Sequence, residues 1–149
     1  MSGTSSRMTA IGTVTMTERD GCITSLELAD GKNCGCSGVL DEAFAQLEEY
    51  LEGKRREFSL SCSPEGTDFQ KDVWSALTRI SYGKTVSYAE LAEMSGHAGA
   101  YRAAGNANGR NPIPIIIPCH RVIRSDGNIG GYSLGTELKT RLLRLEGTI

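Results

Sequence analysis

A proline-rich run in the second half of the chain, residues 111–122 (NPIPIIIPCHRV), constrains the fold more than any other segment. Its three prolines fix φ and lack backbone N–H donors, so the run cannot join a helix. The isoleucine triplet before the last proline is stiff and apolar, which predicts an extended, buried segment. The chain is therefore expected to be organised around a rigid segment that ends at Cys119.

Cys119 lies in a basic stretch of sequence. His120 and Arg121 follow it directly, and no acidic residue occurs between Glu93 and Asp126. Positive groups stabilise a thiolate, so this setting favours a reactive cysteine that acts as a nucleophile. The competing interpretation is a buried structural cysteine, which residue type alone would favour about as strongly.

Length and hydropathy place limits on the class of protein. The 149 residues can bury one good core or two small ones. No apolar run approaches the roughly 20 residues that span a bilayer, and the first residues lack the apolar centre of a signal peptide. We expect a cytoplasmic protein with access to the nucleoid or nucleus, no membrane partner, and a disordered start of roughly eight residues.

The cysteines argue against a disulfide framework, because they are odd in number and irregularly spaced: Cys22, Cys34, Cys36, Cys62 and Cys119. With two histidines in the chain, no metal site and no cofactor are expected. The pair Cys34-Gly35-Cys36 leaves a metal or redox site open, but a plain loop is favoured because no further ligand lies nearby in the sequence.

Charge is distributed unevenly along the chain. Residues 1–66 carry six Lys/Arg and eleven Asp/Glu, a net charge of −5, whereas residues 67–149 carry ten and seven, a net charge of +3. The basic surplus includes Arg102, Arg110, Arg121 and Arg124, which fits a polyanionic partner. A solvated basic face is the alternative interpretation.

The first half predicts a small α/β-type domain, residues 1–64. Residues 11–17 and 22–28 alternate apolar and polar side chains around a turn, which predicts a β-hairpin. Residues 41–52 have helical spacing that Gly53 closes, and residues 56–60 are expected to add a strand. Because this half carries no catalytic constellation, we expect it to serve as a scaffold.

The second half predicts a mainly helical domain, residues 65–149. Capping boxes at Thr67 and Ser87 start two amphipathic helices, the first with Trp74 in its core face. A third helix, residues 100–106, follows a short glycine turn, as in a DNA-binding helix-turn-helix. Helical hairpins with no nucleic-acid role are also common. The fold class is therefore α+β, with a helix-turn-helix-like motif in the second domain.

A closing helix is expected over residues 136–146. Its last residue, Glu146, is a carboxylate at a helix C-terminus, which the helix dipole disfavours. The local sequence leaves two interpretations open, a tolerated surface charge or a carboxylate held by a partner such as His120.

These motifs resemble those of the O6-alkylguanine-DNA alkyltransferases, also called methylated-DNA–protein-cysteine methyltransferases. The hallmark of that family is the run Pro-Cys-His-Arg-Val, which stands here at residues 118–122. The resemblance covers about residues 66–147 and includes Tyr82-Gly83, Ser87-Tyr88, Arg102-Ala103-x-Gly105-x-Ala107-Asn108, Asn111-Pro112, Gly130-Gly131-Tyr132-Ser133 and Leu142-Leu143-x-x-Glu146-Gly147.

The resemblance implies a DNA-repair enzyme that acts once. Its partner would be duplex DNA containing O6-alkylguanine. The alkyl group of that base, or of O4-alkylthymine, would pass irreversibly to Cys119. His120 would act as the base through a water, Glu146 would orient His120, and Asn111 would brace the site. The protein is expected to be a monomer that can cluster on DNA.

The resemblance also assigns the residues that would hold the DNA and the damaged base. Arg102 would enter the duplex from the minor groove and fill the space of the flipped nucleotide. The DNA contacts are assigned to Arg102, Tyr88, Ala103, Ala107, Arg110 and Arg121. The base pocket is assigned to Val122, Tyr132, Ser133, Gly130, Gly131 and Pro114.

Two departures and two alternative functions accompany the resemblance. Ser81 stands where many members have proline, and Tyr101 stands where a small residue is usual. We expect no counterpart of the zinc-bearing amino-terminal domain that some members have. The alternatives are a non-enzymatic sensor of alkylated bases, a class that lacks the cysteine, and a cysteine hydrolase, for which the adjacent residues Cys119 and His120 form a poor dyad.

Overall fold

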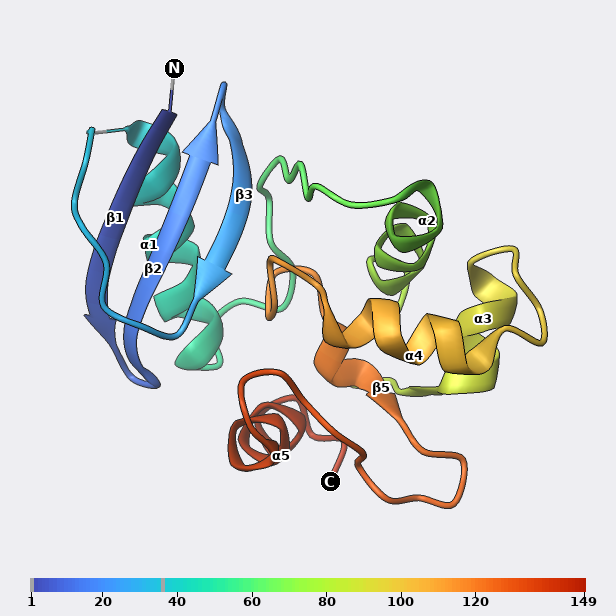
Figure 1. Ribbon diagram of the computed structural model, residues 1–149. Helices are drawn as coiled ribbons and strands as arrows, with labels where there is room; N and C mark the ends of the chain where they lie inside the picture. The colour runs from blue at the N-terminus through green and yellow to red at the C-terminus, as the bar shows by residue number, and fades with distance from the viewer. Residues whose placement is uncertain (1, 36) are drawn as a thin grey trace. The chain divides into compact units, whose positions relative to one another are not determined.

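The computed structural model describes residues 2–35 and 37–149 and separates into two compact units, Met1–Glu65 and Gly66–Ile149 (Figure 1). The first unit is a three-stranded antiparallel sheet with one helix. The second is mainly helical and carries a two-stranded parallel sheet. The α+β fold class expected from the sequence is confirmed.

The sheet of the first unit has the order β1-β2-β3, with β1 Ser2–Thr9, β2 Gly12–Arg19 and β3 Cys22–Glu27. Helix α1, Gly38–Leu51, covers one face of this sheet (Figure 1). Alternate strand residues such as Val14, Met16 and Ile23 are fully buried, and α1 contributes Phe44 and Leu47 to the same core. The expected β2–β3 hairpin is therefore present.

Two expectations for the first unit were wrong. The first residues are not disordered, because Ser2 to Thr9 pair with β2 along their whole length and so form an edge strand. Residues 56–60 are not a strand. The side chain of Gln46 bonds both backbone groups of Ser59, accepting from its N–H at 2.8 Å and donating to its oxygen at 3.5 Å. These backbone groups therefore need no strand partner.

The second unit is built from short elements: α2 Asp68–Leu77, β4 Val86–Ser87, α3 Tyr88–Met94, α4 Tyr101–Gly109, β5 Val122–Ile123 and α5 Thr136–Leu145. Both capping boxes predicted from the sequence are present, at the starts of α2 and α3. Strands β4 and β5 pair in parallel, so the start of α3 lies beside the chain that follows Cys119.

Helices α3 and α4 form the helix-turn-helix-like pair. Their connection, residues 95–100, contains the expected glycines, Gly96 and Gly99, at φ of 85° and 88°. Trp74 in α2 is buried, and its ring N–H donates to the Ala107 oxygen over 2.7 Å. This bond attaches α4 to the core of the unit.

The proline-rich run is buried as expected, but it is not extended. The Ile117 N–H bonds the Ile113 oxygen at 2.9 Å, so the isoleucines form a turn, with Ile115 at a φ of 75°. Asn111 explains the difference: its side chain accepts from the Ile113 N–H at 3.0 Å and donates to the Ile117 oxygen at 2.8 Å. The carboxamide replaces a strand partner for a segment poor in backbone donors.

Helix α5 ends at a glycine that determines where Glu146 points. Gly147 has a φ of 77°, and the N–H groups of Gly147 and Thr148 bond the oxygens of Arg144 at 3.0 Å and Leu143 at 2.9 Å. This is the Schellman arrangement, which needs a left-handed residue that glycine supplies most easily. Glu146 is therefore held at the C-cap with a defined direction.

Candidate active site

Cys119 is the first residue of a short 3-10 helix, Cys119–Arg121, and its side chain is almost completely buried. Burial raises the pKa of the thiol to about 11, although side-chain hydrogen bonds from Asn111 and Tyr132 and the charge of Lys139 act in the opposite direction. The expected thiolate is therefore wrong for the resting state. Loss of hydration outweighs the nearby positive charges, and the resting group is a neutral thiol.

His120, Arg121 and Glu146 form a buried ionic cluster. The Nε2 atom of His120 lies 2.8 Å from Oε2 of Glu146. Arg121 donates from Nε to Oε1 over 2.8 Å and from Nη2 to Oε2 over 2.9 Å, and its Nη1 donates to the Ile80 oxygen over 2.7 Å. Of the two interpretations of Glu146, the structure supports the one in which partners hold the carboxylate.

The surroundings of His120 favour a neutral imidazole. Burial lowers the pKa of this ring, while the Glu146 carboxylate raises it and the charges of Arg121 and Lys139 lower it further. A carboxylate accepts hydrogen bonds, so the proton of the neutral ring belongs on Nε2, facing Glu146. The other ring nitrogen, Nδ1, then carries the lone pair and can accept a proton.

Two residues assigned to DNA contact are buried. Arg121 is 8% exposed because its guanidinium lies against Glu146 and 5.7 Å from the centre of the Tyr82 ring. Ala107 is 2% exposed because it faces Trp74 and the core. In this structure neither side chain is accessible to a DNA partner: Arg121 neutralises a buried carboxylate, and Ala107 packs on α2.

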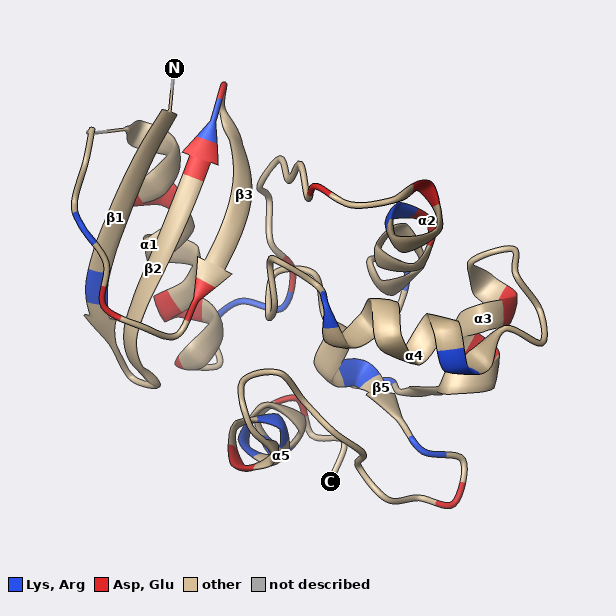
Figure 2. Ribbon diagram, in the orientation of Figure 1, with Lys and Arg blue, Asp and Glu red and all other residues tan. Residues whose placement is uncertain are grey.

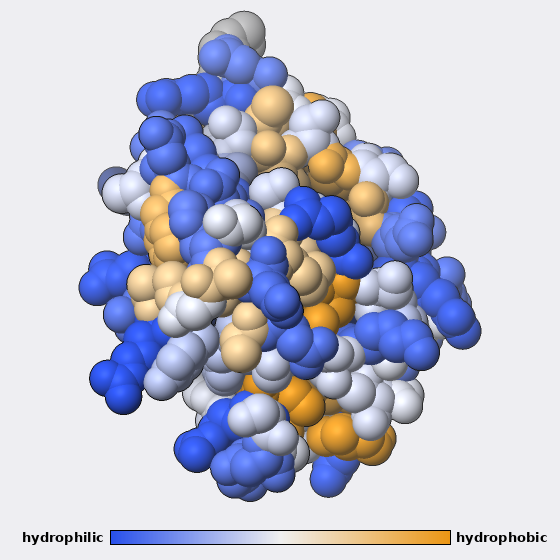
Figure 3. All heavy atoms as spheres, turned by 90° about the vertical axis from the view of Figure 1, so that its right-hand side faces the viewer, coloured by the Kyte–Doolittle hydropathy of each residue, from blue (hydrophilic) through white to orange (hydrophobic). Residues whose placement is uncertain are grey.

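The other residues assigned to DNA contact are accessible. Arg102, Ala103 and Arg110 are exposed along α4 and at its end, and no acidic residue lies among them (Figure 2). The Arg102 guanidinium lies 5.9 Å from the centre of the exposed Tyr101 ring. Hydrophobic residues elsewhere on the face in Figure 3 form small groups separated by hydrophilic ones. The α4 surface is therefore basic and carries one large aromatic side chain.

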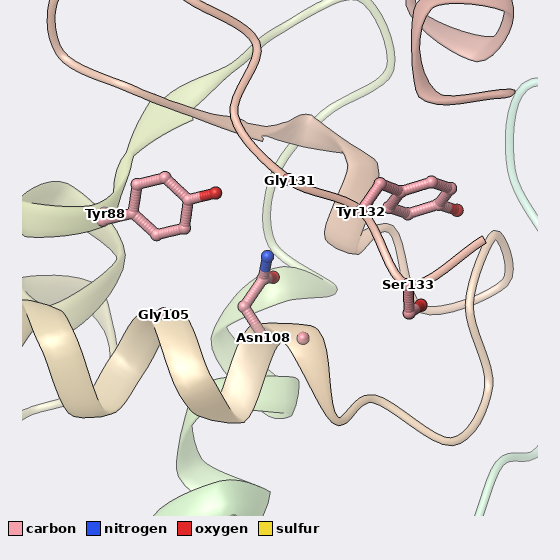
Figure 4. A pocket seen from close by; sticks show the side chains of 7 residues that line it. Tyr88, Gly105, Asn108, Gly131, Tyr132 and Ser133 are labelled. Carbon is pink, nitrogen blue, oxygen red and sulfur yellow. The ribbon is translucent and has the colours of Figure 1, made fainter. Parts of the chain in front are cut away.

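A cavity of about 270 Å³ lies between α3, α4 and the loop before α5. Its lining consists of Tyr88, Gly105, Asn108, Gly109, Gly131, Tyr132 and Ser133 (Figure 4). Burial raises the pKa of the Tyr88 hydroxyl, so this group stays protonated and can donate a hydrogen bond. The volume is close to the roughly 300 Å³ at which small-molecule sites begin.

The structure brings four assigned pocket or DNA residues together around this cavity: Tyr88, Gly131, Tyr132 and Ser133. Gly130 is not among the lining residues but lies against Tyr88, because a Cβ atom added to it would be 2.8 Å from the Tyr88 hydroxyl. Val122 and Pro114 are not among the residues that line this cavity; both are buried, and the Val122 oxygen accepts a bond from Lys139. Sequence reasoning missed Gly105 and Asn108, which lie on the α4 stretch that it had matched to the family, and Gly109, which follows that stretch directly.

Lys139 is a further residue that sequence reasoning missed. It is fully buried, and its ammonium donates to the oxygens of Val122 at 2.7 Å, Gly131 at 3.1 Å and Ile129. These bonds connect the chain after Cys119 to the cavity loop. Its position three and four residues before the buried Leu142 and Leu143 was the available signal, because this spacing selects one face of a helix.

Burial lowers the pKa of Lys139 from 10.5 to about 8. Between pH 8 and pH 10.5 the unfolded chain therefore binds one more proton than the folded chain. The Lys139 contribution to the free energy of unfolding should increase over this range by about 1.4 kcal/mol per pH unit, or about 3 kcal/mol in all. Lys139→Met should remove this increase, as measured by urea unfolding from pH 7.5 to 10.5. Exposed Lys84→Met is the control, and parallel pH profiles for the Lys139 variant and the unaltered protein would refute the assignment.

The described part of the chain holds no group of three or more His, Cys, Asp or Glu side chains that could bind a metal ion. Cys34 is exposed, while Cys36, the other half of the pair considered from the sequence, lies outside the described residues. Within residues 2–35 and 37–149, no helix has the length and apolar character needed to cross a membrane.

Comparison with known proteins identifies the family. Residues 68–148 match the model of the 6-O-methylguanine DNA methyltransferase, DNA binding domain. The chain belongs to this methyltransferase family. A methylated-DNA–protein-cysteine methyltransferase from Methanosarcina barkeri is 58% identical over 105 residues, 70% of this chain and 66% of that relative. One from Mycolicibacterium paratuberculosis is 43% identical over 143 residues, 91% of this chain and 87% of the relative.

Solved methyltransferase structures extend the likeness to both units. The Mycobacterium tuberculosis O6-methylguanine methyltransferase has a TM-score of 0.88 at 39% identity, covering 98% of this chain and 93% of that one. The M. tuberculosis OGT in complex with DNA also has a TM-score of 0.88, at 40% identity, covering 96% and 91%. The resemblance read from the sequence is therefore confirmed at the level of family and fold.

Proposed function

We propose that this methyltransferase-family chain repairs DNA by moving the alkyl group of O6-alkylguanine in a duplex onto its own Cys119, once per molecule. The observation that carries the proposal is the buried thiol of Cys119, directly followed by the His120–Glu146 pair, together with a cavity lined by Tyr88, Tyr132 and Ser133, of which Tyr132 also interacts with the Cys119 side chain. A repair enzyme that is consumed by its reaction needs this combination of a nucleophile, a base and a small pocket, and no cofactor.

His120 supplies the base in the proposed reaction. Residues in a 3-10 helix are spaced by about 120° around the axis, so Cys119 and His120 point in different directions and a water between them carries the proton. The thiol proton passes to Nδ1 of His120, while the hydrogen bond to Glu146 stabilises the imidazolium that forms. Glu146 is therefore the orienting group.

The methyl group then moves in a single displacement. The sulfur of Cys119 forms a bond to the methyl carbon as the bond from that carbon to O6 breaks, and the electron pair returns to O6. Guanine regains its carbonyl and takes a proton at N1, which balances the proton lost by the thiol. The thioether has no proton to lose and no route back to a thiol in this reaction, so each molecule acts once.

The high pKa of the resting thiol fits this use. Burial raises the pKa of Cys119 to about 11, so at neutral pH the group is a weak nucleophile toward electrophiles in solution. Deprotonation of the thiol needs His120. The buried site admits a flipped nucleobase more readily than it admits bulk water. A protein that reacts once is thereby protected from wasteful alkylation.

The exposed arginines of α4 carry the proposed DNA contact. Arg102 lies in the first turn of α4, and Arg110 directly follows the last residue of that helix. Both arginines can therefore neutralise phosphates or enter a groove. Arg102 takes the place of the flipped nucleotide in the stack, with the neighbouring Ala103 allowing close approach. The likeness to the M. tuberculosis OGT in complex with DNA supports DNA as the partner.

The test is the intact mass of the protein after incubation with an excess of duplex containing O6-methylguanine. The expected result is a gain of one methyl group that stops at one equivalent and is absent from Cys119→Ser. Binding without a mass gain would contradict the proposal in favour of a sensor of alkylated bases. Continued turnover beyond one equivalent would contradict it in favour of a hydrolytic enzyme.

A further inference from the structure

Arg124 lies beside the cavity and has no role in the proposed chemistry. Strand β5 ends at Ile123, so Arg124 is the first residue of the loop that leads to Gly130 and Tyr132. A Cβ atom added to Gly130 would lie 2.8 Å from the Tyr88 hydroxyl and 3.5 Å from Cγ of Arg124. The arginine side chain and the tyrosine hydroxyl therefore meet at one glycine, next to the lining of the cavity.

The charge of Arg124 acts on the Tyr88 hydroxyl. Burial raises the pKa of this hydroxyl, and the Arg124 guanidinium acts in the opposite direction, which requires the two groups to be close. The Arg124 side chain is 61% exposed, so its charged end lies in solvent while its stem runs along Gly130. The rim of the cavity thus carries a cation that an anion in solution can reach.

A tight turn holds Arg124 in this position. The Arg124 N–H bonds the Asn128 oxygen at 2.8 Å, and the Arg124 oxygen accepts from the Gly127 N–H at 3.1 Å. Asp126 accepts from the Asn128 N–H at 3.0 Å through Oδ1, and its Oδ2 lies 3.2 Å from Nη2 of Arg124. An exposed ion pair contributes little free energy, because water competes for both charges. Asp126 can therefore hold the guanidinium in the free protein and release it to a stronger partner.

A nucleotide whose base enters the cavity leaves its sugar and its two phosphates at the rim. The cavity of about 270 Å³ suits one base, and a phosphate drawn inside would lose the hydration of its charge. Arg124 offers a planar guanidinium, whose parallel N–H donors match two oxygens of one phosphate. Arg102 lies on α4, whereas Arg124 lies on the loop that supplies Gly131 and Tyr132 to the lining. The loop side of the cavity therefore has a phosphate-binding group of its own.

Building on the proposed function, we infer that Arg124 is a substrate-positioning residue that binds a phosphate flanking the flipped O6-alkylguanine and so holds that nucleotide in the cavity. Its guanidinium exchanges the Asp126 carboxylate for phosphate oxygens as the base enters. The contact is made only after flipping, so it stabilises the flipped state and not the first complex with a stacked duplex. Arg124 consequently increases the rate of methyl transfer from a duplex more than it increases the affinity for undamaged DNA.

The test combines Arg124→Gln with duplexes in which one phosphate beside the O6-methylguanine, on the 5′ or the 3′ side, is an uncharged methylphosphonate. Single-turnover rate constants for methylation of Cys119 are measured for each pairing. On the unmodified duplex, Arg124→Gln should slow methylation roughly tenfold, the lower end of what a hydrogen bond to a charged group contributes. On the duplex that lacks the contacted phosphate, the same substitution should cost almost nothing further. This non-additivity is the mark of a direct contact.

Two controls separate this contact from a general charge effect and from a folding defect. Arg141→Gln, at an exposed position of α5, should have additive effects with both methylphosphonates. Free O6-benzylguanine carries no phosphate, so its reaction should change little in Arg124→Gln. Additive costs of Arg124→Gln with both methylphosphonates, or equal slowing with the free base, would overturn the inference and leave the proposed function standing. Failure of the unaltered protein to methylate Cys119 from the unmodified duplex would overturn both.

Discussion

Glu146→Gln is expected to lower the free energy of unfolding by about 3 to 5 kcal/mol, because it leaves the buried Arg121 guanidinium without its charged partner. The carboxylate accepts two bonds from Arg121 and one from His120, and its side chain is inaccessible to solvent. A neutral amide of the same shape cannot balance the guanidinium, and water cannot reach it. Urea unfolding at pH 7 measures the loss.

The same substitution should slow methyl transfer at least 100-fold, since the imidazolium of His120 would lose the carboxylate that stabilises it. Single-turnover transfer from O6-methylguanine duplex measures this rate under conditions where the variant is folded. Exposed Glu93 in α3 provides the control, and Glu93→Gln should change neither quantity appreciably. A stable, fully active Glu146→Gln would show that the ionic cluster has no part in the reaction.

Arg102→Ala is expected to slow methyl transfer from duplex DNA by at least 100-fold while leaving reaction with free O6-benzylguanine nearly unchanged. The reason is that the free base needs no flipping, and flipping a nucleotide costs a few kcal/mol that the inserted side chain offsets. Arg102 is exposed and lies on the outer face of α4, so its removal should leave the core intact. Rate constants for the two substrates, measured side by side, give the ratio.

Arg141→Ala is the matched control, because Arg141 is exposed on α5 and its removal changes net charge by the same amount. Its effect on the duplex reaction should be small and should vanish at high salt, as expected of a general charge effect. If Arg102→Ala slowed both substrates equally, the arginine would act on the cavity or on folding, and the flipping role would have to be abandoned.

The fold could be predicted from sequence where local signals agreed with one another. The capping boxes at Thr67 and Ser87 and the β2–β3 hairpin are such cases, because each is specified within a few residues. Strand β1 was missed because its serines and threonines show no apolar alternation, and pairing with β2 is what orders it. The prolines of the run before Cys119 excluded a helix, but its turn depends on Asn111 side-chain bonds that no spacing rule reveals.

The candidate site could be predicted in its residue types but not in its electrostatics. The basic neighbours of Cys119 suggested a thiolate, but burial raises the pKa of the thiol and reverses that expectation. The burial of a side chain depends on tertiary packing within the second unit, which local sequence does not show. Arg121 was assigned to DNA contact because the sequence shows its charge. The sequence does not show that this charge is paired with the buried Glu146 carboxylate. Lys139 and Asn108 were missed because their hydrogen-bond partners are backbone oxygens. Every residue has such an oxygen, so no pattern of side chains in the sequence marks the contact.

The most direct test of the central claim is to find where the alkyl group goes. The protein is reacted with duplex DNA whose O6-methylguanine carries a deuterated methyl group, digested, and examined by fragmentation mass spectrometry. The expected result is one deuterated methyl group on the sulfur of Cys119, with the other four cysteines unmodified. Finding the label on another cysteine, or on none while the DNA lesion persists, would contradict the account.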